Sequence, residues 1–390
     1  MKRNFSMMFV FLVIFWPALI RGQKSAPKAR VENIDGVECI HNPGTPLHPE
    51  KTVTFVEDLS ISAEDKNGNI VFIEPWLSFV DDHENIYIIE RRDQVIKVFR
   101  PDGKQIRTIG AKGSGPGEFR EIMVNNLAIT KDGILLTHDA NSRRTSFFDS
   151  SGRFLRSFQW RKRYGKYLLT KDSSFIICTL EPSGDARTQV NVEEIDFDGK
   201  ERSIEGRFAE IKGSVIHQGN MAYYFSPPVV RSSEFAGDQN RGLFYHCVNS
   251  QYIIEVYDTS GKIFRKIDRP YKPVPFADKD AKEYRTRNSI NVPNEFRKAI
   301  NEMEMPKVKS IVENMLVDNK SNLWIQTNEK KEEGDKILTA FDIFDSDGYY
   351  FAKAWTAVIP RIFKKGKMYM MEKDQDTGYQ TLKRYKVIWN

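Results

Sequence analysis

HDANSRRTSFFDSSGRFLRSF, residues 138–158, is the stretch that decides the fold of this chain. It contains two runs rich in β-branched and aromatic residues, separated by the turn Asp149-Ser150-Ser151-Gly152. Runs of this composition favour strands. Asp and Ser supply side-chain caps to a turn, and Gly adopts the positive φ that such a turn requires. The stretch therefore predicts a β-hairpin.

The same turn recurs along the chain. An aromatic or aliphatic residue followed by an Asp-containing turn that ends in glycine occurs in five copies, which end at Gly103, Gly152, Gly199, Gly261 and Gly348. A second unit, a turn followed by a short apolar run, occurs in six copies at residues 85–88, 133–136, 174–177, 242–245, 322–325 and 366–369. Two hairpins give four strands per repeat. The spacings of 49 residues from Gly103 to Gly152 and 47 from Gly152 to Gly199 fit one blade of a β-propeller.

The six repeats predict an all-β fold, a six-bladed β-propeller. The last repeat lacks one strand, and we expect residues 51–69 to supply it, because a ring closed by one strand from each chain end has no free sheet edge. The expected blades cover residues 70–120, 121–163, 164–212, 222–271, 311–356 and 357–390. Residues 272–310 break the period. Their charged and apolar residues, at loosely helical spacing between prolines, predict a short helical insertion between blades 4 and 5.

The N-terminus has the pattern of an export signal. Lys2 and Arg3 precede the 14-residue apolar run Met7–Ile20. A membrane-spanning helix needs about 20 apolar residues, so the run is short for one. We expect a signal peptide at 1–22, an N-terminal linker at 23–50 and the propeller at 51–390. The protein would then be periplasmic or secreted; retention of the first segment as an N-terminal membrane anchor is the alternative.

Charge and cysteine content narrow the class further. The chain carries 59 basic and 53 acidic residues, and removal of residues 1–22 would lower the net charge from +6 to +3 by taking away three basic residues and no acidic one. This mild excess does not indicate a nucleic-acid partner. Cys178 and Cys247 lie in apolar runs and are expected to be buried thiols. A disulfide between them is the alternative, which requires Cα atoms within about 7 Å.

Part of the chain resembles a known group. Asp139, Arg144, Phe148, Asp149 and Gly152 fall in register with the NHL repeat pattern. The loop IGAKGSGPGEF at 109–119 is similar to the Gly-rich blade connector of NHL and TolB-like propellers, and the C-terminal half looks like exported bacterial six-bladed β-propeller proteins of uncharacterised role. The resemblance implies the fold over residues 51–390. It does not imply an activity, because such propellers host many functions.

No catalytic or metal-binding motif is complete. The loop at 110–117 lacks the Gly-Lys-Ser/Thr that opens a helix in a phosphate-binding loop. The Asp-rich turn at 342–348 lacks the Glu of an EF-hand, since position 356 is Thr. The six histidines show no HExxH or i, i+4 spacing. We therefore assign no catalytic residue, metal ligand or cofactor, although ligands from separate blades could still meet on the channel axis.

The fold itself indicates where a ligand would bind. In a propeller the first strand of each blade lines the central channel, and the polar or aromatic residues expected near its mouth are Trp76, Asn125, Asn126, Tyr167, Tyr223, Tyr224, Asn314 and Arg361. These are the candidate ligand-binding residues; alternatively, they merely fill and solvate the channel.

The sequence favours an exported, monomeric, non-enzymatic binding or scaffold module for a protein, peptide or glycan partner. The alternative is a metal-dependent hydrolase or lyase, of the lactonase or esterase type, with its site on the channel axis.

Overall fold

The computed structural model describes most of the chain. It covers residues 28–390 except 161, 163, 183–186, 205, 207, 209, 210, 213, 219, 220, 226–231, 291 and 375. For residues 124–126, 164, 182, 187, 211, 212, 214–218, 221–225 and 295 it describes the backbone alone. The segment predicted as a signal peptide, residues 1–22, lies outside the described residues.

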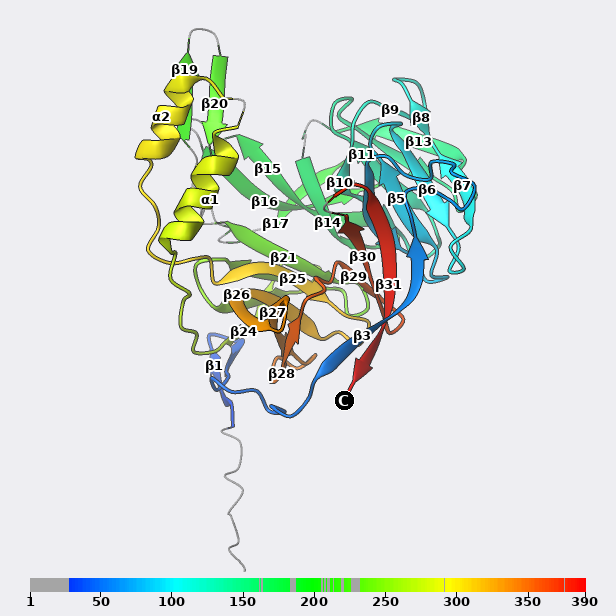
Figure 1. The fold of residues 1–390 in the computed structure, drawn as a ribbon. Coiled ribbons are helices and arrows are strands. Elements are labelled where there is room, and N and C mark those ends of the chain that lie inside the picture. The colour runs from blue at the N-terminus through cyan, green and yellow to red at the C-terminus, as the bar shows by residue number, and fades with distance from the viewer. Residues whose placement is uncertain are drawn as a thin grey trace, which may run out of the picture.

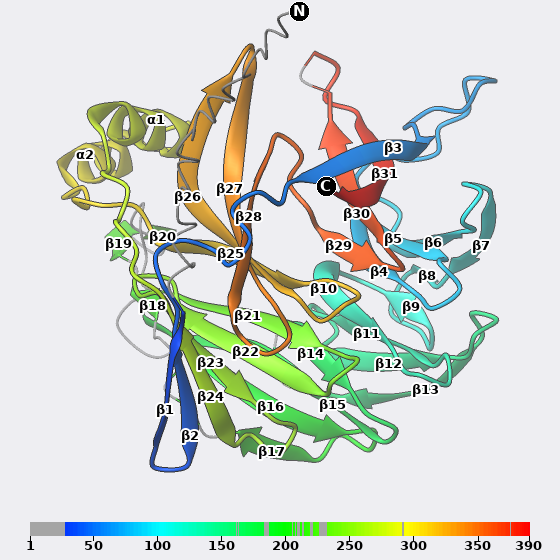
Figure 2. The ribbon, with the colours of Figure 1, turned by 90° about the horizontal axis from the view of Figure 1, so that it is seen from below.

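Six blades of four antiparallel strands stand around a central axis, and in blades 1 to 5 the innermost strand comes first in the sequence (Figures 1 and 2). Blade 1 contains β4 (Pro75–Val80), β5 (Ile86–Glu90), β6 (Val95–Phe99) and β7 (Gln105–Ile109); blade 2 contains β10 (Ile122–Ile129), β11 (Leu135–Asp139), β12 (Arg144–Phe148) and β13 (Phe154–Gln159). Blade 3 contains β14 (Tyr164–Thr170), β15 (Ser174–Pro182), β16 (Arg187–Asp196) and β17 (Glu201–Ile204); blade 4 contains β21 (Ser233–Asp238), β22 (Leu243–Val248), β23 (Ile253–Tyr257) and β24 (Ile263–Asp268). Blade 5 contains β25 (Val312–Val317), β26 (Leu323–Glu333), β27 (Lys336–Phe344) and β28 (Tyr350–Thr356); blade 6 contains β29 (Ile362–Lys364), β30 (Lys367–Lys373), β31 (Gln380–Trp389) and β3 (Val53–Ile61). The prediction of a six-bladed β-propeller is confirmed.

Blade 6 closes the ring in the predicted way. Its outer strand, β3, comes from near the N-terminus and pairs antiparallel with β31, from Val53 opposite Trp389 to Ile61 opposite Leu382. Lys383 on β31 also donates a 3.0 Å hydrogen bond to Glu57 on β3. The two ends of the propeller are therefore held together in one sheet.

The connectors between blades gather on one end of the ring, which we call the connector face (Figure 1). The predicted helical insertion is there: α1 (Asp278–Asn288) and α2 (Asn294–Glu302) lie between blades 4 and 5 and pack on each other through Tyr284, Phe296 and Ile300. The short strands β8 (Ala111–Lys112) and β9 (Glu118–Phe119) connect blades 1 and 2. Neither helix, within the described residues, is long and apolar enough to cross a membrane.

The expected start of blade 4 was wrong. Residues 221–225, expected on its inner strand, form β20 (Met221–Phe225), which pairs with β19 (Ser214–Gln218) in a separate hairpin. This hairpin and the short β18 (Ile211–Lys212) connect blades 3 and 4, and the hairpin stands beside α1 and α2 in both ribbon views (Figures 1 and 2). An apolar run predicts a strand but not its pairing partner, so the sequence could not distinguish β20 from β21.

The repeated glycine turns lock neighbouring blades together. Gly152 and Gly261 both have φ of +88°, which favours glycine. Each also faces the outer strand of the preceding blade. A Cβ on Gly152 would lie 2.8 Å from Cγ1 of Ile109, and one on Gly261 would lie 2.6 Å from Cγ2 of Ile204. The turn that identified the fold thus also spaces its blades.

An arginine contact accompanies these turns. On four blades an arginine of the outer strand reaches the Asp-containing turn of the next blade. The pairs are Arg107 with the Ser150 carbonyl, Arg156 with the Asp198 carboxylate, Arg202 with the Ser260 carbonyl and Arg265 with the Ser346 carbonyl. Because the turn and its arginine recur from blade to blade, the same contact recurs around the ring.

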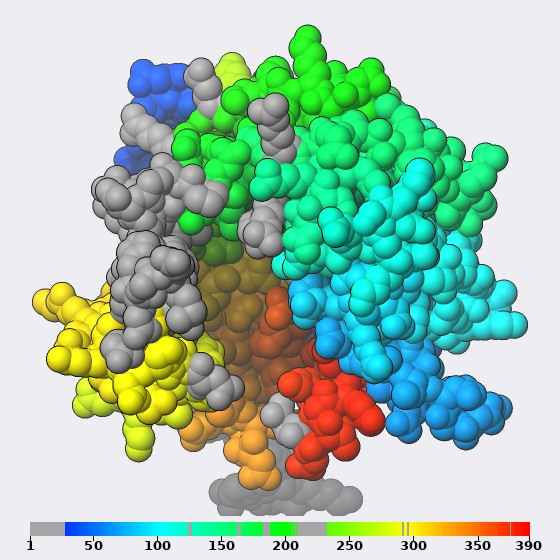
Figure 3. Space-filling view, turned by 90° about the horizontal axis from the view of Figure 1, so that it is seen from above, coloured from blue at the N-terminus to red at the C-terminus, as the bar shows by residue number. Residues whose placement is uncertain are grey.

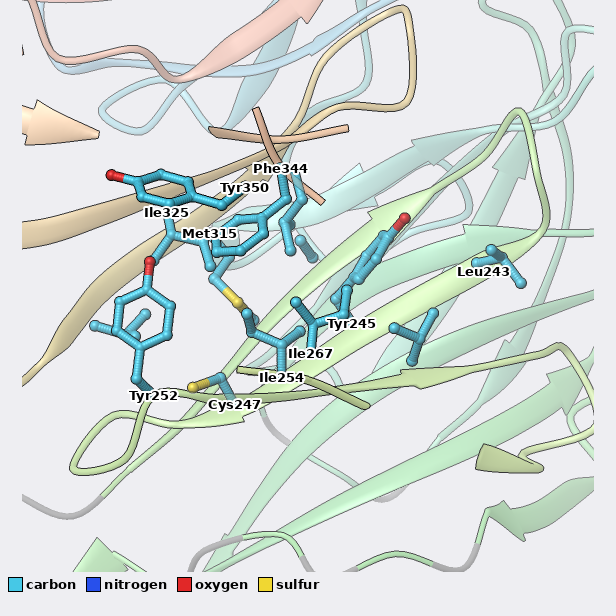
Figure 4. Close-up of a cluster of buried hydrophobic side chains, with 14 residues drawn as sticks. Leu243, Tyr245, Cys247, Tyr252, Ile254, Ile267, Met315, Ile325, Phe344 and Tyr350 are labelled. Atoms are coloured by element: carbon cyan, nitrogen blue, oxygen red, sulfur yellow. The ribbon is translucent and has the colours of Figure 1, made fainter. Parts of the chain in front are cut away.

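The cluster between blades 4 and 5 shows how the apolar faces meet (Figure 4). Cys247 and Ile254 from blade 4 pack with Met315 and Phe344 from blade 5, all almost fully buried. Cys39, Cys178 and Cys247 are all free and buried, so the alternative disulfide between Cys178 and Cys247 is not formed. Burial raises the pKa of the Cys178 and Cys247 thiols to about 12, which makes both unreactive.

The stretch expected as a linker contains a hairpin. Strands β1 (Arg30–Ile34) and β2 (Val37–His41) pair with each other, and β2 adds to the outer edge of blade 4 parallel to β24. Residues 42–52, which we call the strap, then cross blade 5 to reach β3. Asn42 exchanges hydrogen bonds with the Gly348 carbonyl and the Tyr350 amide at 3.0 and 2.8 Å, and the Leu47 amide donates to the Tyr350 carbonyl at 2.8 Å. The segment before β3 therefore bridges blades 4, 5 and 6.

Candidate functional site

The six inner strands enclose a cavity of about 510 Å³ on the axis of the ring, which we call the channel cavity. Every blade contributes to its wall, through residues that include Phe79, Ala128, Tyr167, Gly237, Leu316 and Phe363. The inner strands approach one another closely. A Cβ on Gly237 would lie 1.8 Å from the carbonyl oxygen of Leu168 on the neighbouring blade. Only glycine fits at this position of β21.

The connector face is recessed over the axis (Figure 3). The yellow helices α1 and α2 stand at one side of this hollow and blades 1 and 2 at the other. The cavity wall continues to the opposite end of the ring, which we call the turn face, where each first strand turns into the second. Its lining there includes Asp82, Gln239, Asn319 and Lys365.

Hydrogen bonds between blades hold the turn face in place. The Gln239 amide group accepts from the Thr170 amide at 2.8 Å and donates to the Thr170 carbonyl at 2.6 Å, which joins blades 4 and 3. The Asn319 side chain accepts from the Gly366 amide at 3.0 Å, which joins blades 5 and 6. Lys364 of blade 6 pairs with Asp82 of blade 1 at 2.6 Å. The mouth is therefore rigid, because its polar side chains tie neighbouring blades together.

The acidic side chains of the wall are mostly satisfied by the protein. The hydrogen bond from Lys364 lowers the pKa of the Asp82 carboxyl. Asp318 accepts four hydrogen bonds, two from backbone amides and one each from Asn322 and Trp324. Asp238 is almost fully buried; its Oδ1 accepts from the amides of Asn240 and Arg241, whereas its buried Oδ2 has no partner among the described residues.

The basic side chains are less satisfied. Half-buried Lys166 on β14 donates a 2.7 Å hydrogen bond to the Phe235 carbonyl, and burial lowers the pKa of its ammonium group. In the described part of the chain, no carboxylate lies within ion-pair distance of Lys166, Arg361 or Lys365. Glu234, beside Phe235 on β21, does not line the cavity. Burial raises the pKa of its carboxyl to about 7, although the charge of Lys166 acts in the opposite direction.

The structure places the candidate residues predicted from the sequence in different parts of the fold. Tyr167 and Arg361 line the channel cavity. Trp76 is the second residue of β4; it lies under the Arg91 guanidinium at 4.3 Å and packs between blades 1 and 2. Asn314 lies half-buried on β25 outside the cavity wall. Asn125 and Asn126 lie on β10, and Tyr223 and Tyr224 lie on β20 outside the six blades, but the side chains of these four are not described. Any role of these residues in binding stays a prediction.

Several wall residues escaped the sequence reasoning. Lys166, Gln239, Lys364 and Lys365 all line the cavity. Three of them come at or directly after the end of an inner strand, so the repeat position of the first turn was the signal that could have found them. Lys166 lies within its strand and had no such signal.

The described residues contain no group of three or more His, Cys, Asp or Glu side chains arranged to hold a metal ion. The histidines placed within the blades serve local contacts. His138 makes a 2.9 Å hydrogen bond with the Lys162 carbonyl, and burial lowers the pKa of its ring to about 4. His246 contacts Glu255 and Ser233 at 3.2 and 3.0 Å. Neither lines the channel cavity.

Comparison with known proteins supports the same fold. Residues 76–157 match the family DUF5128, described as a 6-bladed beta-propeller. The fold is thus recognised in sequence as well as in space. Curated proteins include no match to this sequence.

Solved structures cover nearly the whole ring. A DUF4221 family member from Bacteroides vulgatus aligns with a TM-score of 0.54 and 11% identity over 86% of this chain and 98% of its own. A Bacteroides fragilis protein described as exported aligns with a TM-score of 0.50 and 10% identity over 90% and 99%. Virginiamycin B lyase from Staphylococcus aureus aligns with a TM-score of 0.42 and 12% identity over 86% and 99%. At these identities the likeness to the two Bacteroides proteins is one of fold alone.

Proposed function

We propose that this protein is an exported binding module that holds part of a protein, peptide or glycan partner in its channel cavity. The observation that carries the proposal is a cavity walled by all six inner strands, with polar side chains fixed at its mouth. Its volume of about 510 Å³ lies within the range of ligand pockets, about 300–1,000 Å³.

The rigidity of the mouth supports binding. Gln239 and Asn319 join neighbouring blades by hydrogen bonds, so a ligand meets a preformed surface and loses little free energy to ordering it. Carboxylates of the cavity wall are also engaged by the protein itself: Lys364 pairs with Asp82, and the Trp324 indole donates to Asp318. This supports a binding role.

Export is supported by two observations of different kinds. The sequence begins with a basic and then apolar segment of the signal-peptide pattern. One of the similar propellers, from Bacteroides fragilis, is described as exported. A periplasmic or secreted location is thus part of the proposal.

Arrays of glycans and short peptides test the proposal when they are probed with the wild type and with a cavity-filled variant. Ser78→Trp places a large ring in the wall, since Ser78 on β4 lines the cavity. Leu155→Trp on β13 is the matched control, because Leu155 is an exposed side chain outside the cavity. We expect binding that Ser78→Trp abolishes and Leu155→Trp preserves, with unchanged circular dichroism for both.

The enzymatic alternative is tested on the same proteins. A panel of lactones and esters is incubated with each protein and with Ca²⁺, Mg²⁺ or Zn²⁺. Metal-dependent turnover that disappears in Ser78→Trp would replace the binding module by a hydrolase or lyase. Binding unaffected by Ser78→Trp would place the ligand outside the channel cavity.

A further inference from the structure

We propose that the channel cavity recognises its ligand through a carboxylate group held between Lys166 and Arg361. This inference rests on the proposed function and names the chemical class of the ligand. Both cations line the cavity. They come from blades 3 and 6, which stand opposite each other in a ring of six, so a group on the axis has a cation on each of two opposite sides.

The free donors of these two side chains support the assignment. A lysine ammonium group has three N–H donors, and the Phe235 carbonyl accepts one of them at 2.7 Å. Arg361 is exposed directly before β29, and no described carboxylate lies within ion-pair distance of it or of Lys166. A carboxylate can accept from both cations at once, and such charge-assisted bonds are about twice as strong as neutral ones.

The acidic residues of the wall do not neutralise this pair. Lys364 engages Asp82 at 2.6 Å, and four donors of its own blade engage Asp318. Asp238 is almost fully buried, and the amides of Asn240 and Arg241 donate to one of its carboxylate oxygens. The three aspartates disfavour a doubly charged phosphate through like-charge repulsion. A singly charged carboxylate fits the wall better.

Titration calorimetry with matched probes tests the assignment. The first pair is the acetylated, amidated tripeptide Gly-Asp-Gly and its Gly-Asn-Gly analogue, which differ in one charge. The second pair is acetate and sulfate, which compares a singly charged carboxylate with a doubly charged anion. In each pair we expect the probe that carries a carboxylate to bind at least about tenfold more tightly than the other probe. A hydrogen bond to a charged group, about 1.5–3 kcal/mol, implies a difference of this size. Binding of acetate but not the tripeptide would identify the source as a free acid, and the reverse would identify a peptide side chain.

Variants locate the carboxylate in the cavity. Lys166→Met and Arg361→Gln should each weaken carboxylate binding about tenfold and bring the Asp and Asn tripeptides closer in affinity. Lys336→Gln is the matched control, because it removes one exposed positive charge at the start of β27, outside the cavity wall. If Lys166→Met fails to fold, exposed Arg361→Gln still tests the proposal.

The outcomes separate this inference from the proposed function. Equal affinity for the Asp and Asn tripeptides, or for sulfate and acetate, would overturn the carboxylate assignment. The binding module would stand if Ser78→Trp still abolished a neutral array ligand. If every ligand still bound to the Ser78→Trp variant, both proposals would be wrong. No carboxylate binding at millimolar concentration would overturn this inference alone.

Discussion

Arg269 and Asp342 form an ion pair that is buried between blades 4 and 5. Arg269 Nε donates to Asp342 Oδ2 at 3.1 Å, and the hydroxyls of Tyr252 and Tyr350 donate to the same carboxylate at 2.7 Å each. The guanidinium lies over both tyrosine rings, at 4.6 and 4.9 Å from their centroids. Every oxygen of Asp342 is therefore satisfied without water.

We expect Arg269→Met to destabilise the protein by about 3–5 kcal/mol, because it leaves Asp342 buried without its counter-charge. Urea unfolding measures the loss. Adding Asp342→Asn should recover part of it, since the uncompensated charge is removed. Arg153→Met, which removes an exposed arginine, serves as the control and should change stability by less than about 0.5 kcal/mol. An Arg269→Met variant as stable to urea as the wild type would contradict this account.

Glu234 should give the protein a pH-dependent stability. Burial raises the pKa of its carboxyl to about 7, whereas the carboxyl of an unfolded chain titrates near its ordinary value of 4.5. Between these values the folded state binds more protons than the unfolded state, so stability falls as the pH rises from 4.5 to 7. Glu234→Gln should flatten this slope and stabilise the protein above pH 7 on the order of 2 kcal/mol. Melting temperatures across this pH range measure it; an unchanged slope would exclude Glu234 as its source.

At the residue scale the sequence predicted positions better than partners. Tyr167 and Arg361 line the channel because the repeat places them on or beside inner strands. Lys166 could not be chosen from the sequence, since its place in the cavity wall depends on its distance to the Phe235 carbonyl on the next blade. Such a distance depends on how two blades pack, which no single repeat encodes.

The glycine turn is the element that can be tested most directly. We expect Gly261→Ala to cost about 1–3 kcal/mol for overpacking against Ile204, in addition to about 1 kcal/mol for the positive φ. Gly334→Ala is the matched control, since Gly334 has φ of +58° and open space around its Cα. Thermal unfolding of both variants separates the cost of overpacking from the cost of the positive φ. Equal losses would show that the contact with Ile204 contributes nothing.

Elements were predictable where their signal was local. The Asp-containing turns, the closing strand β3 and the insertion that holds α1 and α2 follow from patterns within short stretches. The inner strand of blade 4 was misplaced because β20 has the same apolar composition as a blade strand but pairs with β19. The β1–β2 hairpin was missed for a similar reason. Its strand β2 pairs in parallel with β24, and the paired residues are more than 200 positions apart in the sequence.

The N-terminal segment stabilises the ring through two parts, the β1–β2 hairpin with the strap and the strand β3, which truncation can remove one after the other. We expect a protein that starts at residue 51 to fold with a lower melting temperature, because it lacks the β1–β2 hairpin and the strap but keeps β3. A protein that starts at residue 63 lacks β3, which leaves the edge of β31 unpaired and prone to association.

Calorimetry and light scattering compare the two truncated proteins. The first should melt cooperatively as a monomer and the second should aggregate. If the protein starting at residue 63 melted as cooperatively as the one starting at residue 51, ring closure by β3 would not be needed for the fold.

Closure by the two chain ends also sets the order of events in time. Lys383 and Glu57, which meet in blade 6, are 326 positions apart in the sequence. Hairpins within a blade close short loops and form quickly, whereas contacts of such long range form slowly. During synthesis, β3 is among the first strands to emerge and β31 is the last. The first strand of the propeller must therefore wait, unpaired, until its partner has been made.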